Sequence, residues 1–184
     1  SSFKETGEGD SVDLARAAKG RMDVQEAISK GNYSAKDVYN ADETGLYYRM
    51  PPSRSLAEKA ENVKGVKKQK DRVTVLLCAN ADGSDKRIPI LIGKSVNPQC
   101  FKKINLDLFQ CKYVAQKSAW MDSHIFESFL INLDRDMRNQ GRSILLLIDN
   151  ASVHCVNETS LTNVKVHFLE PNTTSHIQPC DAGI

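Results

Sequence analysis

Ser143-Ile144-Leu145-Leu146-Leu147-Ile148-Asp149-Asn150, which continues to His154, is the stretch that decides the fold of this chain. Five consecutive large aliphatic residues between Ser143 and Asp149 predict a strand that is buried on both faces, in the middle of an α/β sheet. Open α/β sheets place their ligand sites at the carboxyl ends of the strands, so Asp149 is a candidate for chemistry. Asp and Asn also favour turns, and this stretch alone supports a turn equally well.

Composition limits the class of protein. A chain of 184 residues usually forms one domain, and 40% hydrophobic with 26% charged residues is typical of a globular protein. No apolar run approaches the ~18 residues of a membrane span, and the first residues lack a signal-peptide core, which predicts an intracellular protein without membrane contact. The five cysteines are widely spaced and include no Cys-x-x-Cys pair, which favours reduced thiols over disulfides or a zinc ribbon.

The first part of the chain, residues 1–33, is predicted to be a flexible arm or linker from an upstream domain. Glycines interrupt its short polar segments, and only Val24 to Ile28 has the pattern of a helical turn or two. The character changes at residue 34, and residues 34–184 are assigned to a single domain.

That domain has the pattern of a mixed α/β sheet. Three antiparallel strands are expected first, at Val38–Tyr48, Arg72–Ala79 and Lys86–Gly93, with the third at or near an edge because Pro89 lacks an amide donor. A short strand around Tyr113 is the only regular structure expected between Lys94 and Trp120. A helix should run from Asp122-Ser123 to Gly141, with an apolar stripe that packs on the sheet. The buried strand, a shorter strand at Val164–Leu169 and a helix start near Pro179 follow.

Three aspartates, Asp42, Asp149 and Asp181, occupy positions that this topology could bring to one edge of the sheet. Three carboxylates held close together repel one another unless a cation neutralises them, and hard cations such as Mg²⁺ or Mn²⁺ prefer oxygen ligands. Two such ions in a carboxylate frame are suited to phosphoryl transfer.

Three motifs carry a resemblance to a known family, and they appear in this order: Asn40-Ala41-Asp42-Glu43-Thr44-Gly45-Leu46; Leu147-Ile148-Asp149-Asn150 with His154; and Phe168 to Ile184, which includes Gln178-Pro179-Cys180-Asp181. From about Asn32 onward the chain resembles the catalytic domain of pogo/Tigger-type transposases of the DDE superfamily and their domesticated Jerky-like and centromere-protein-B-like relatives. The resemblance implies a ribonuclease-H-like fold in which Asp42, Asp149 and Asp181 are the catalytic, metal-binding residues.

The resemblance also implies partners and a location. The implied partners are DNA and Mg²⁺ or Mn²⁺ in a two-metal site, with a possible homodimer in the full-length protein. The implied location is the nucleus. The chain departs from the family pattern at Glu170 and Ala182, where proline and glutamine are common, and it is expected to stop before the family's closing helix. Asp181 should therefore be poorly held, and this chain by itself should not cleave DNA. Whether the parent protein is an active endonuclease and strand transferase, an inactive DNA-binding descendant or a protein-interaction module stays open.

Several other residues are secondary candidates. Glu43 should point to the face opposite Asp42, while Asn150 and His154 could either contact a phosphate or simply satisfy local hydrogen bonds. A zinc site is disfavoured because the histidines and cysteines His154, Cys155, His167, His176 and Cys180 lack paired spacing. Trp120 is expected in the core rather than at a base-stacking surface.

Basic residues are concentrated between Arg49 and Arg72, a stretch that contains eight basic and three acidic residues. Such a stretch could follow DNA phosphates beside the site or could be a solvated loop, and both interpretations stay open. The residues proposed to contact DNA are Lys64, Lys67, Lys68, Lys70, Arg72, Lys102 and Lys103.

Overall fold

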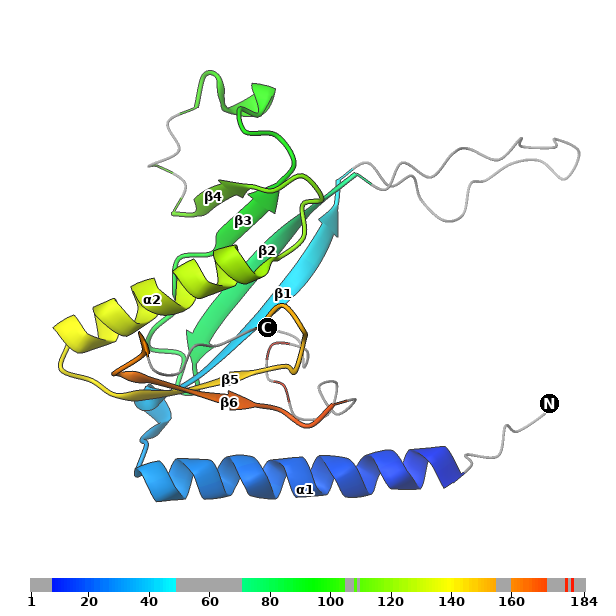
Figure 1. The fold of residues 1–184 in the computed structure, drawn as a ribbon, viewed down its shortest axis with the longest axis vertical. Helices are drawn as coiled ribbons and strands as arrows, with labels where there is room; N and C mark the ends of the chain where they lie inside the picture. Colours follow the sequence, from blue (N-terminus) through cyan, green and yellow to red (C-terminus); the bar gives the residue numbers. More distant parts are fainter. Residues whose placement is uncertain are drawn as a thin grey trace, which may run out of the picture.

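The fold is a mixed six-stranded sheet in the order β4-β3-β2-β1-β5-β6, with a helix on each face (Figure 1). It is seen in a computed structural model that describes residues 8–48, 71–104, 108, 110–154, 160–171, 178 and 180. The strands are β1 (Val38–Tyr47), β2 (Arg72–Asn80), β3 (Ile90–Gly93), β4 (Lys112–Ala115), β5 (Ile144–Ile148) and β6 (Val164–Phe168). The helices are α1 (Glu8–Gly31) and α2 (Ser123–Asn139), with short 3₁₀ turns η1 (Ala35–Asp37) and η2 (Gln99–Phe101).

The three antiparallel strands, the buried strand and the shorter strand that the sequence predicts are all present. β1, β2 and β3 are antiparallel neighbours, whereas β5 pairs in parallel with both β1 and β6. Every residue of β5 is buried, as its unbroken aliphatic run predicts for a central strand. The strand predicted around Tyr113 is β4, and it pairs in parallel with β3 at the edge of the sheet.

The third strand is shorter than the sequence predicts. It begins at Ile90 rather than Lys86, and Lys86 forms only an isolated bridge with Ala79. Pro89, which has no amide donor, separates the two, and its carbonyl accepts a hydrogen bond from the Lys112 amide at 2.8 Å.

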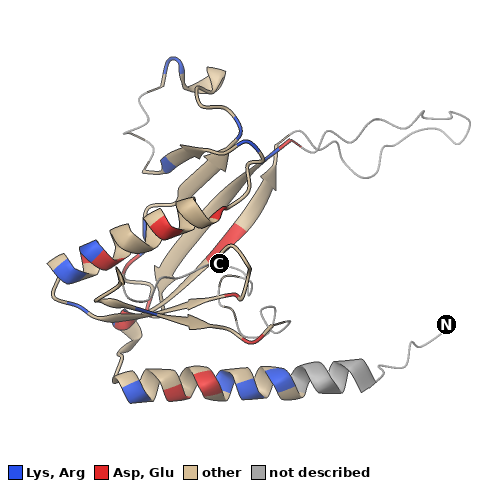
Figure 2. Ribbon diagram, in the orientation of Figure 1, with Lys and Arg blue, Asp and Glu red and all other residues tan. Residues whose placement is uncertain are grey.

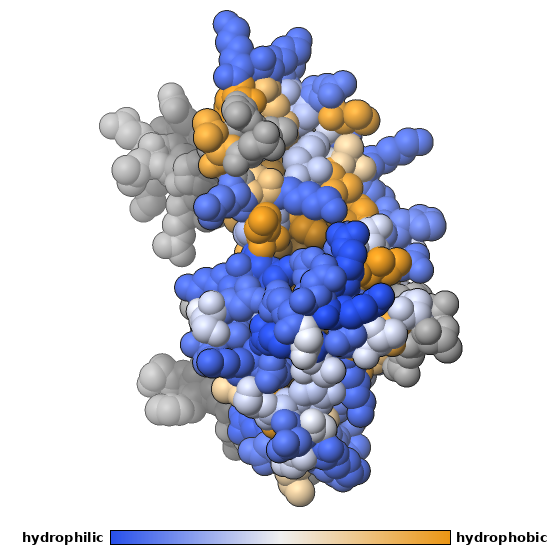
Figure 3. Space-filling view, turned by 90° about the vertical axis from the view of Figure 1, so that its left-hand side faces the viewer, coloured by the Kyte–Doolittle hydropathy of each residue, from blue (hydrophilic) through white to orange (hydrophobic). Residues whose placement is uncertain are grey.

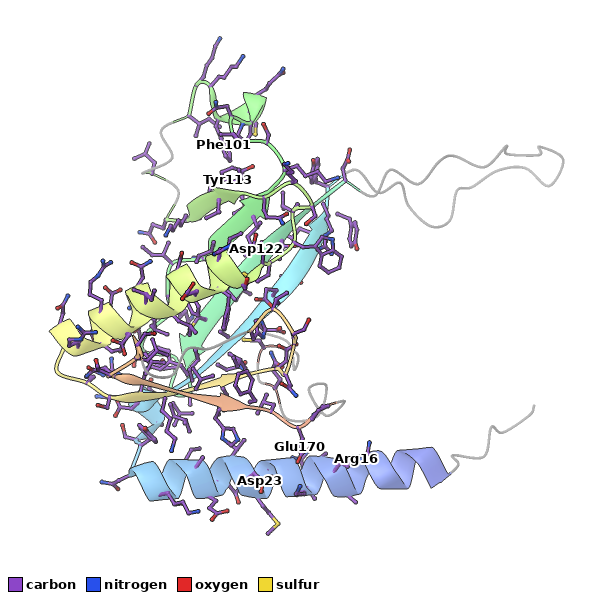
Figure 4. All side chains as sticks on the ribbon, in the orientation of Figure 1. Arg16, Asp23, Phe101, Tyr113, Asp122 and Glu170 are labelled. Carbon is purple, nitrogen blue, oxygen red and sulfur yellow. The ribbon has the colours of Figure 1, made fainter. Side chains whose placement is uncertain are left out.

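Helix α2 covers one face of the sheet. The Asp122 side chain caps it by accepting a hydrogen bond from the Ile125 amide, and Gly141 follows its end with φ +64°. Its buried stripe includes Phe126, Leu130 and Leu133, which pack with Ile144, Leu146 and Ile148 of β5 in the larger hydrophobic cluster. Asp122 is labelled at the start of this helix in Figure 4.

Helix α1 covers the opposite face and is far longer than the turn or two predicted at Val24–Ile28. It has 24 residues, and its side chains Val24, Ala27 and Ile28 pack against a second cluster formed by Val38, Leu145, Leu147 and Leu169. Lys19 of α1 also forms a 3.0 Å ion pair with Glu170, which Figure 4 shows reaching toward the helix from the end of β6. The assignment of residues 1–33 to a linker from an upstream domain stays a prediction.

The surface at the C-terminal end of α2 has a hydrophobic part and a hydrophilic part. Figure 3 faces this end and shows hydrophobic side chains gathered in the upper half, with a mostly hydrophilic surface below, toward α1. Within the described ranges, neither helix is long and apolar enough to cross a membrane.

Candidate active site

The pairing of β1 with β5 aligns two of the predicted aspartates. Val38 is opposite Leu145, Tyr39 opposite Leu146 and Asn40 opposite Leu147. Continuing this parallel register for two more residues on each chain brings Asp42 opposite Asp149. Adjacent strands lie about 4.8 Å apart, so the register, extended past the last paired residues Asn40 and Leu147, predicts that the two aspartates are neighbours. Figure 2 shows the acidic band in the middle of β1 beside the loop that follows β5.

Strand alternation, extended one residue past the end of β5, predicts that Asp42 and Asp149 belong to the same face of the sheet. Side chains alternate along a strand, so Asp42 shares a face with Val38, and Asp149 shares a face with Leu145 and Leu147. Val38, Leu145 and Leu147 all pack in the cluster beneath α1. The side chain of Asp149 is 32% exposed and that of Asp42 is half-buried, so both carboxylates border solvent rather than the core.

Local hydrogen bonds fix each carboxylate. Asp42 Oδ1 accepts from the Glu43 amide at 2.8 Å, and Asp149 Oδ1 accepts from the Ala151 amide at 3.3 Å. The second hydrogen bond closes a turn, because the aspartate side chain accepts it from the backbone amide two residues later. The turn expected at Asp149-Asn150 is therefore present, and it lies at the carboxyl end of a central strand.

His154 joins Asp149 to Glu43 on the α2 side of the sheet. Its Nδ1 lies 2.6 Å from Asp149 Oδ1, and its Nε2 lies 3.1 Å from Glu43 Oε1. Glu43 thus points away from the face that Asp42 occupies, as strand alternation predicts. The side chain of His154 is 2% exposed, and its ring lies 4.3 Å from that of Phe126, centroid to centroid.

The charge of this bridge follows from its geometry. A neutral imidazole can donate from only one nitrogen, whereas the imidazolium donates from both, and both nitrogens face carboxylates here. Burial opposes protonation, yet the hydrogen bond and charge of Glu43, with those of Asp149, raise the pKa of His154 above its usual value. Of the two roles considered for His154, a satisfied hydrogen-bonding role is the one observed; zinc ligation would require it to give up one of these carboxylates.

Asn40 connects β1 to the segment that carries the third aspartate. Its Nδ2 donates to the Leu147 carbonyl at 3.0 Å, and its Oδ1 accepts from the Cys180 amide at 2.9 Å. Gln178, which is 2% exposed, donates to the Ala41 carbonyl at 3.4 Å. Residues 178 and 180 therefore contact β1 within two residues of Asp42.

The remaining predicted residues are distributed as follows. Asp181 and four of the lysines, Lys64, Lys67, Lys68 and Lys70, lie outside the described residues. Asn150 is exposed just after Asp149. Lys102 and Lys103 are exposed after η2, next to Phe101, whose ring packs edge-on against Tyr113 of β4 (Figure 4). β4 is three strands away from β1, so these two lysines are well separated from Asp42.

Two parts of the site were not predicted. The link through Glu43, His154 and Asp149 joins residues 111 positions apart, which no local spacing reveals. The bonds of Asn40 were also missed, although a polar residue between the apolar Tyr39 and Ala41 is a signal, because a buried amide needs partners. No described group of three or more His, Cys, Asp or Glu side chains is arranged to hold a metal ion, but Asp181 is not among the residues described.

The comparisons of this chain with known proteins agree on one family. A sequence profile described as DDE superfamily endonuclease matches residues 70–184. The chain is 40% identical over 154 residues to Tigger transposable element-derived protein 4 of Mus musculus, covering 83% of this chain and 29% of that protein. It is 35% identical over 191 residues to CENP-B homolog protein 2 of Schizosaccharomyces pombe, covering 99% of this chain and 36% of that protein.

A further relative and two structures complete the comparison. Jerky protein homolog of Homo sapiens is 38% identical over 161 residues, covering 82% of this chain and 28% of its own length. The chain therefore spans only about a third of these curated relatives. The Mos1 transposase paired-end complex with left transposon end superposes with a TM-score of 0.54 at 13% identity, covering 99% of this chain and 47% of that one.

A pre-cleavage Mos1 transpososome gives a TM-score of 0.55 at 12% identity, covering 98% of this chain and 51% of the other. At such low identity the likeness concerns the fold alone, which is the ribonuclease-H-like sheet that the sequence predicts.

Proposed function

This chain belongs to the DDE superfamily endonuclease family, and on that premise we propose that it is the catalytic core of a nuclear, transposase-derived DNA-binding protein. The proposed chemistry is metal-dependent phosphoryl transfer on DNA, with Asp42, Asp149 and Asp181 as the metal ligands. The observation that supports the proposal is the β1–β5 register, because its extension would bring Asp42, in the middle of β1, opposite Asp149, which directly follows β5.

The donor set fits a hard divalent cation. The proposed ligands are carboxylate oxygens that border solvent, with no thiolate or imidazole among them. Such a ligand set suits Mg²⁺ or Mn²⁺. When bound, such ions polarise phosphate oxygens and activate an attacking oxygen. Asp42 and Asp149 would hold the ion from the sheet, and Asp181 would approach from the segment whose Cys180 amide is bonded to Asn40.

The chain's own residues supply the positioning. Asn40 holds the Leu147 carbonyl and the Cys180 amide together, which supports a fixed distance between β5 and the last segment. His154 holds Asp149 Oδ1 from the α2 side, and the Ala151 amide donates to the same oxygen. Positions fixed in this way are required for metal-assisted transfer.

DNA is the proposed partner, and the names of relatives support this choice. They include ARS-binding protein 1 and a centromere autoantigen, besides the Mos1 complex with a transposon end. Lys64, Lys67, Lys68 and Lys70 are proposed to contact phosphates, with Arg72 at the start of β2 and Lys102 and Lys103 at the far edge. The full-length protein is proposed to form a homodimer. A domesticated, non-catalytic DNA-binding protein is the alternative, and the same experiment separates the two.

The test is a metal titration with a charge-neutralising variant. Asp42→Asn is preferred to Asp149→Asn because Asn can still accept the Glu43 amide, whereas Asp149 also pairs with His154. Mn²⁺ at 100 times its dissociation constant should stabilise the wild-type chain by about 2.7 kcal/mol, measured as an increased Tm. Asp42→Asn should lose most of this increase. Glu127→Gln, which removes one exposed charge on α2, should keep it.

Nicking of a labelled DNA duplex then separates the active and inactive forms. An intact parent protein that nicks DNA with Mg²⁺, and loses this activity in Asp42→Asn, supports the endonuclease. Metal-independent DNA binding without nicking supports the domesticated alternative. An equal Mn²⁺-induced increase in Tm in wild type, Asp42→Asn and Asp149→Asn would contradict the proposed metal site.

A further inference from the structure

Trp120 lies on the surface, and the prediction that it belongs to the core is wrong. The residue is 60% exposed, and the guanidinium carbon of Arg72 lies 3.1 Å from its ring centroid. This is a cation–π arrangement in which the cation covers one face of the indole. The exposed surface of the ring must therefore belong to its other face and its edges.

The backbone around Trp120 is firmly held in this outward position. The preceding residue, Ala119, is fully buried and has φ +55°, a left-handed conformation that costs energy in a non-glycine residue. The carbonyl of Ala119 accepts from Thr74 Oγ1 at 2.7 Å, and Thr74 Oγ1 accepts from Arg72 Nη2 at 3.1 Å. One chain of hydrogen bonds from β2 thus supports both the indole and the cation beneath it.

The Trp120–Arg72 pair lies along β1 from the proposed metal ligands. A Cβ atom added to Gly45 would meet Arg72 Nη1 at 3.4 Å, so the guanidinium lies over Gly45. Gly45 follows Asp42 by three residues, which is about 10 Å along a strand.

Further positive charge surrounds the pair. Lys94 and Lys117 are both exposed. Lys94 follows Gly93 and Lys117 follows Gln116, and the Gln116 amide donates a hydrogen bond of 2.8 Å to the Gly93 carbonyl. Gly93 ends β3, whose residue Ile92 pairs with Thr74 of β2. The backbone of both lysines thus lies near the Trp120–Arg72 pair, and an aromatic ring together with basic residues is the combination that single-strand-binding surfaces use.

We infer that Trp120, backed by Arg72, is a stacking platform for an unpaired base of a DNA strand whose phosphates lie against Lys94 and Lys117. A base within a duplex has both faces covered by its neighbours, so only an unpaired or extruded base can present a face to the indole. Arg72 keeps the ring in place and adds positive charge beneath it. The inference rests on the proposed function for its choice of DNA, but the platform itself requires no metal.

The chain offers a direct readout because Trp120 is its only tryptophan. A short oligothymidylate added in EDTA should quench the intrinsic fluorescence, because a stacked base is in contact with the indole. A strand of equal length and charge made of abasic nucleotides should bind through its phosphates without comparable quenching. Equal quenching by the two strands would overturn the inference.

Variants are compared by the anisotropy of a fluorescently labelled oligothymidylate. Trp120→Ala should weaken binding about tenfold or more, given the usual contribution of one stacked base. Trp120→Phe should recover most of this loss, because it restores an aromatic face. The matched control is Ile88→Ala, which truncates a side chain that is 65% exposed on a different part of the surface and should change nothing.

The outcomes distinguish this inference from the proposed function. Unchanged affinity in Trp120→Ala would overturn the platform even if Asp42→Asn abolishes the Mn²⁺ response. If the Mn²⁺ response is absent in the wild-type chain, but base-dependent quenching and the loss in Trp120→Ala are observed, then the metal site is wrong and the platform stands. Trp120→Ala should itself retain the wild-type Mn²⁺ response.

Discussion

Glu43 connects β1 to the loop that follows β5 through a hydrogen bond to His154. Adjacent to a proposed metal ligand, it points to the other face and bonds His154 Nε2 at 3.1 Å. Its side chain is 18% exposed and that of His154 is 2% exposed, so this pair is largely shielded from water. Removing Glu43 would leave Nε2 of the buried imidazole without its partner, while Nδ1 keeps Asp149.

We therefore expect Glu43→Ala to lower the free energy of unfolding by about 1–3 kcal/mol, the usual contribution of a hydrogen bond to a charged group. Urea denaturation at neutral pH measures this change. Glu127→Ala truncates the same residue type at an exposed position and should stay within about 0.5 kcal/mol of wild type. A Glu43→Ala variant as stable as Glu127→Ala would mean that the bridge to His154 contributes nothing.

Asp134 gives a second prediction, this time about pH. Its side chain is 2% exposed, and Oδ1 accepts from the amides of Thr162, Asn163 and Val164 at the start of β6. Burial alone would raise the pKa of this carboxyl, but these amides and Arg138 lower it to about 2. The folded pKa is below the unfolded value, so the stabilisation is present above about pH 4 and is lost as pH falls toward 2.

The size of this pH effect should be about 2 kcal/mol, because each pKa unit corresponds to 1.36 kcal/mol. Asp134→Asn should reduce stability at pH 7 and flatten the decline in stability between pH 4 and pH 2, measured by urea denaturation at several pH values. If the wild type and Asp134→Asn decline in parallel over that interval, other carboxyls are responsible for the acid sensitivity.

Among the elements, the strands and α2 could be predicted because their patterns are local. The aliphatic run of β5, the β-branched run of β2, and the Asp122 cap with Gly141 after α2 each specify a structure without help from distant residues. The site could be predicted only in part. The resemblance predicts Asp42 and Asp149 as site residues, which stays a prediction, whereas the bonds of Asn40, Glu43 and His154 depend on pairing between distant strands.

Helix α1 was underestimated because its buried stripe is made of small residues. Ala17 and Gly20 are buried, and Val24 and Ile28 continue the stripe at intervals of three or four residues. Small residues let a helix approach the sheet closely but add little hydrophobicity, so the segment resembles a polar linker. Trp120 was misplaced for the opposite reason, because its hydrophobicity favours burial and nothing local indicates that Arg72 covers its ring.

The close packing of α1 can be tested with two neighbouring alanines. Ala17 is 1% exposed and Ala18 is exposed. Ala17→Leu should lower the free energy of unfolding by about 1–3 kcal/mol, because three additional carbon atoms do not fit at a packed contact. Ala18→Leu makes the same change toward solvent and should be nearly neutral, as thermal denaturation would show. Equal stability of the two variants would indicate that α1 does not pack on the sheet.

At the scale of the whole molecule, Asn40 joins three distant parts of the chain. It lies on β1 and bonds β5 at the Leu147 carbonyl and the last segment at the Cys180 amide. Being 5% exposed, it cannot exchange these partners for water. Its removal would therefore take one hydrogen-bond partner from each of two backbone groups.

Asn40→Ala should destabilise the protein by about 1–3 kcal/mol and should also accelerate hydrogen exchange at the Cys180 amide. Asn132→Ala, which removes an exposed amide on α2 that bonds only within its helix, is the matched control and should do neither. Lower stability with unchanged exchange at Cys180 would show that the last segment is held by other contacts.

The pairing of β1 with β5 has a further consequence during synthesis. Asn40 and Leu147 are 107 residues apart, and ribosomes add about 5–20 residues per second. For roughly 5–20 seconds, β1 therefore has β2 as a neighbour on one side and an open edge on the other. An open edge can pair with another nascent chain, so translation that stalls before Ile144 should produce aggregates rather than soluble intermediates. The strand that carries Asp42 is thus the one most in need of a chaperone while the protein is being made.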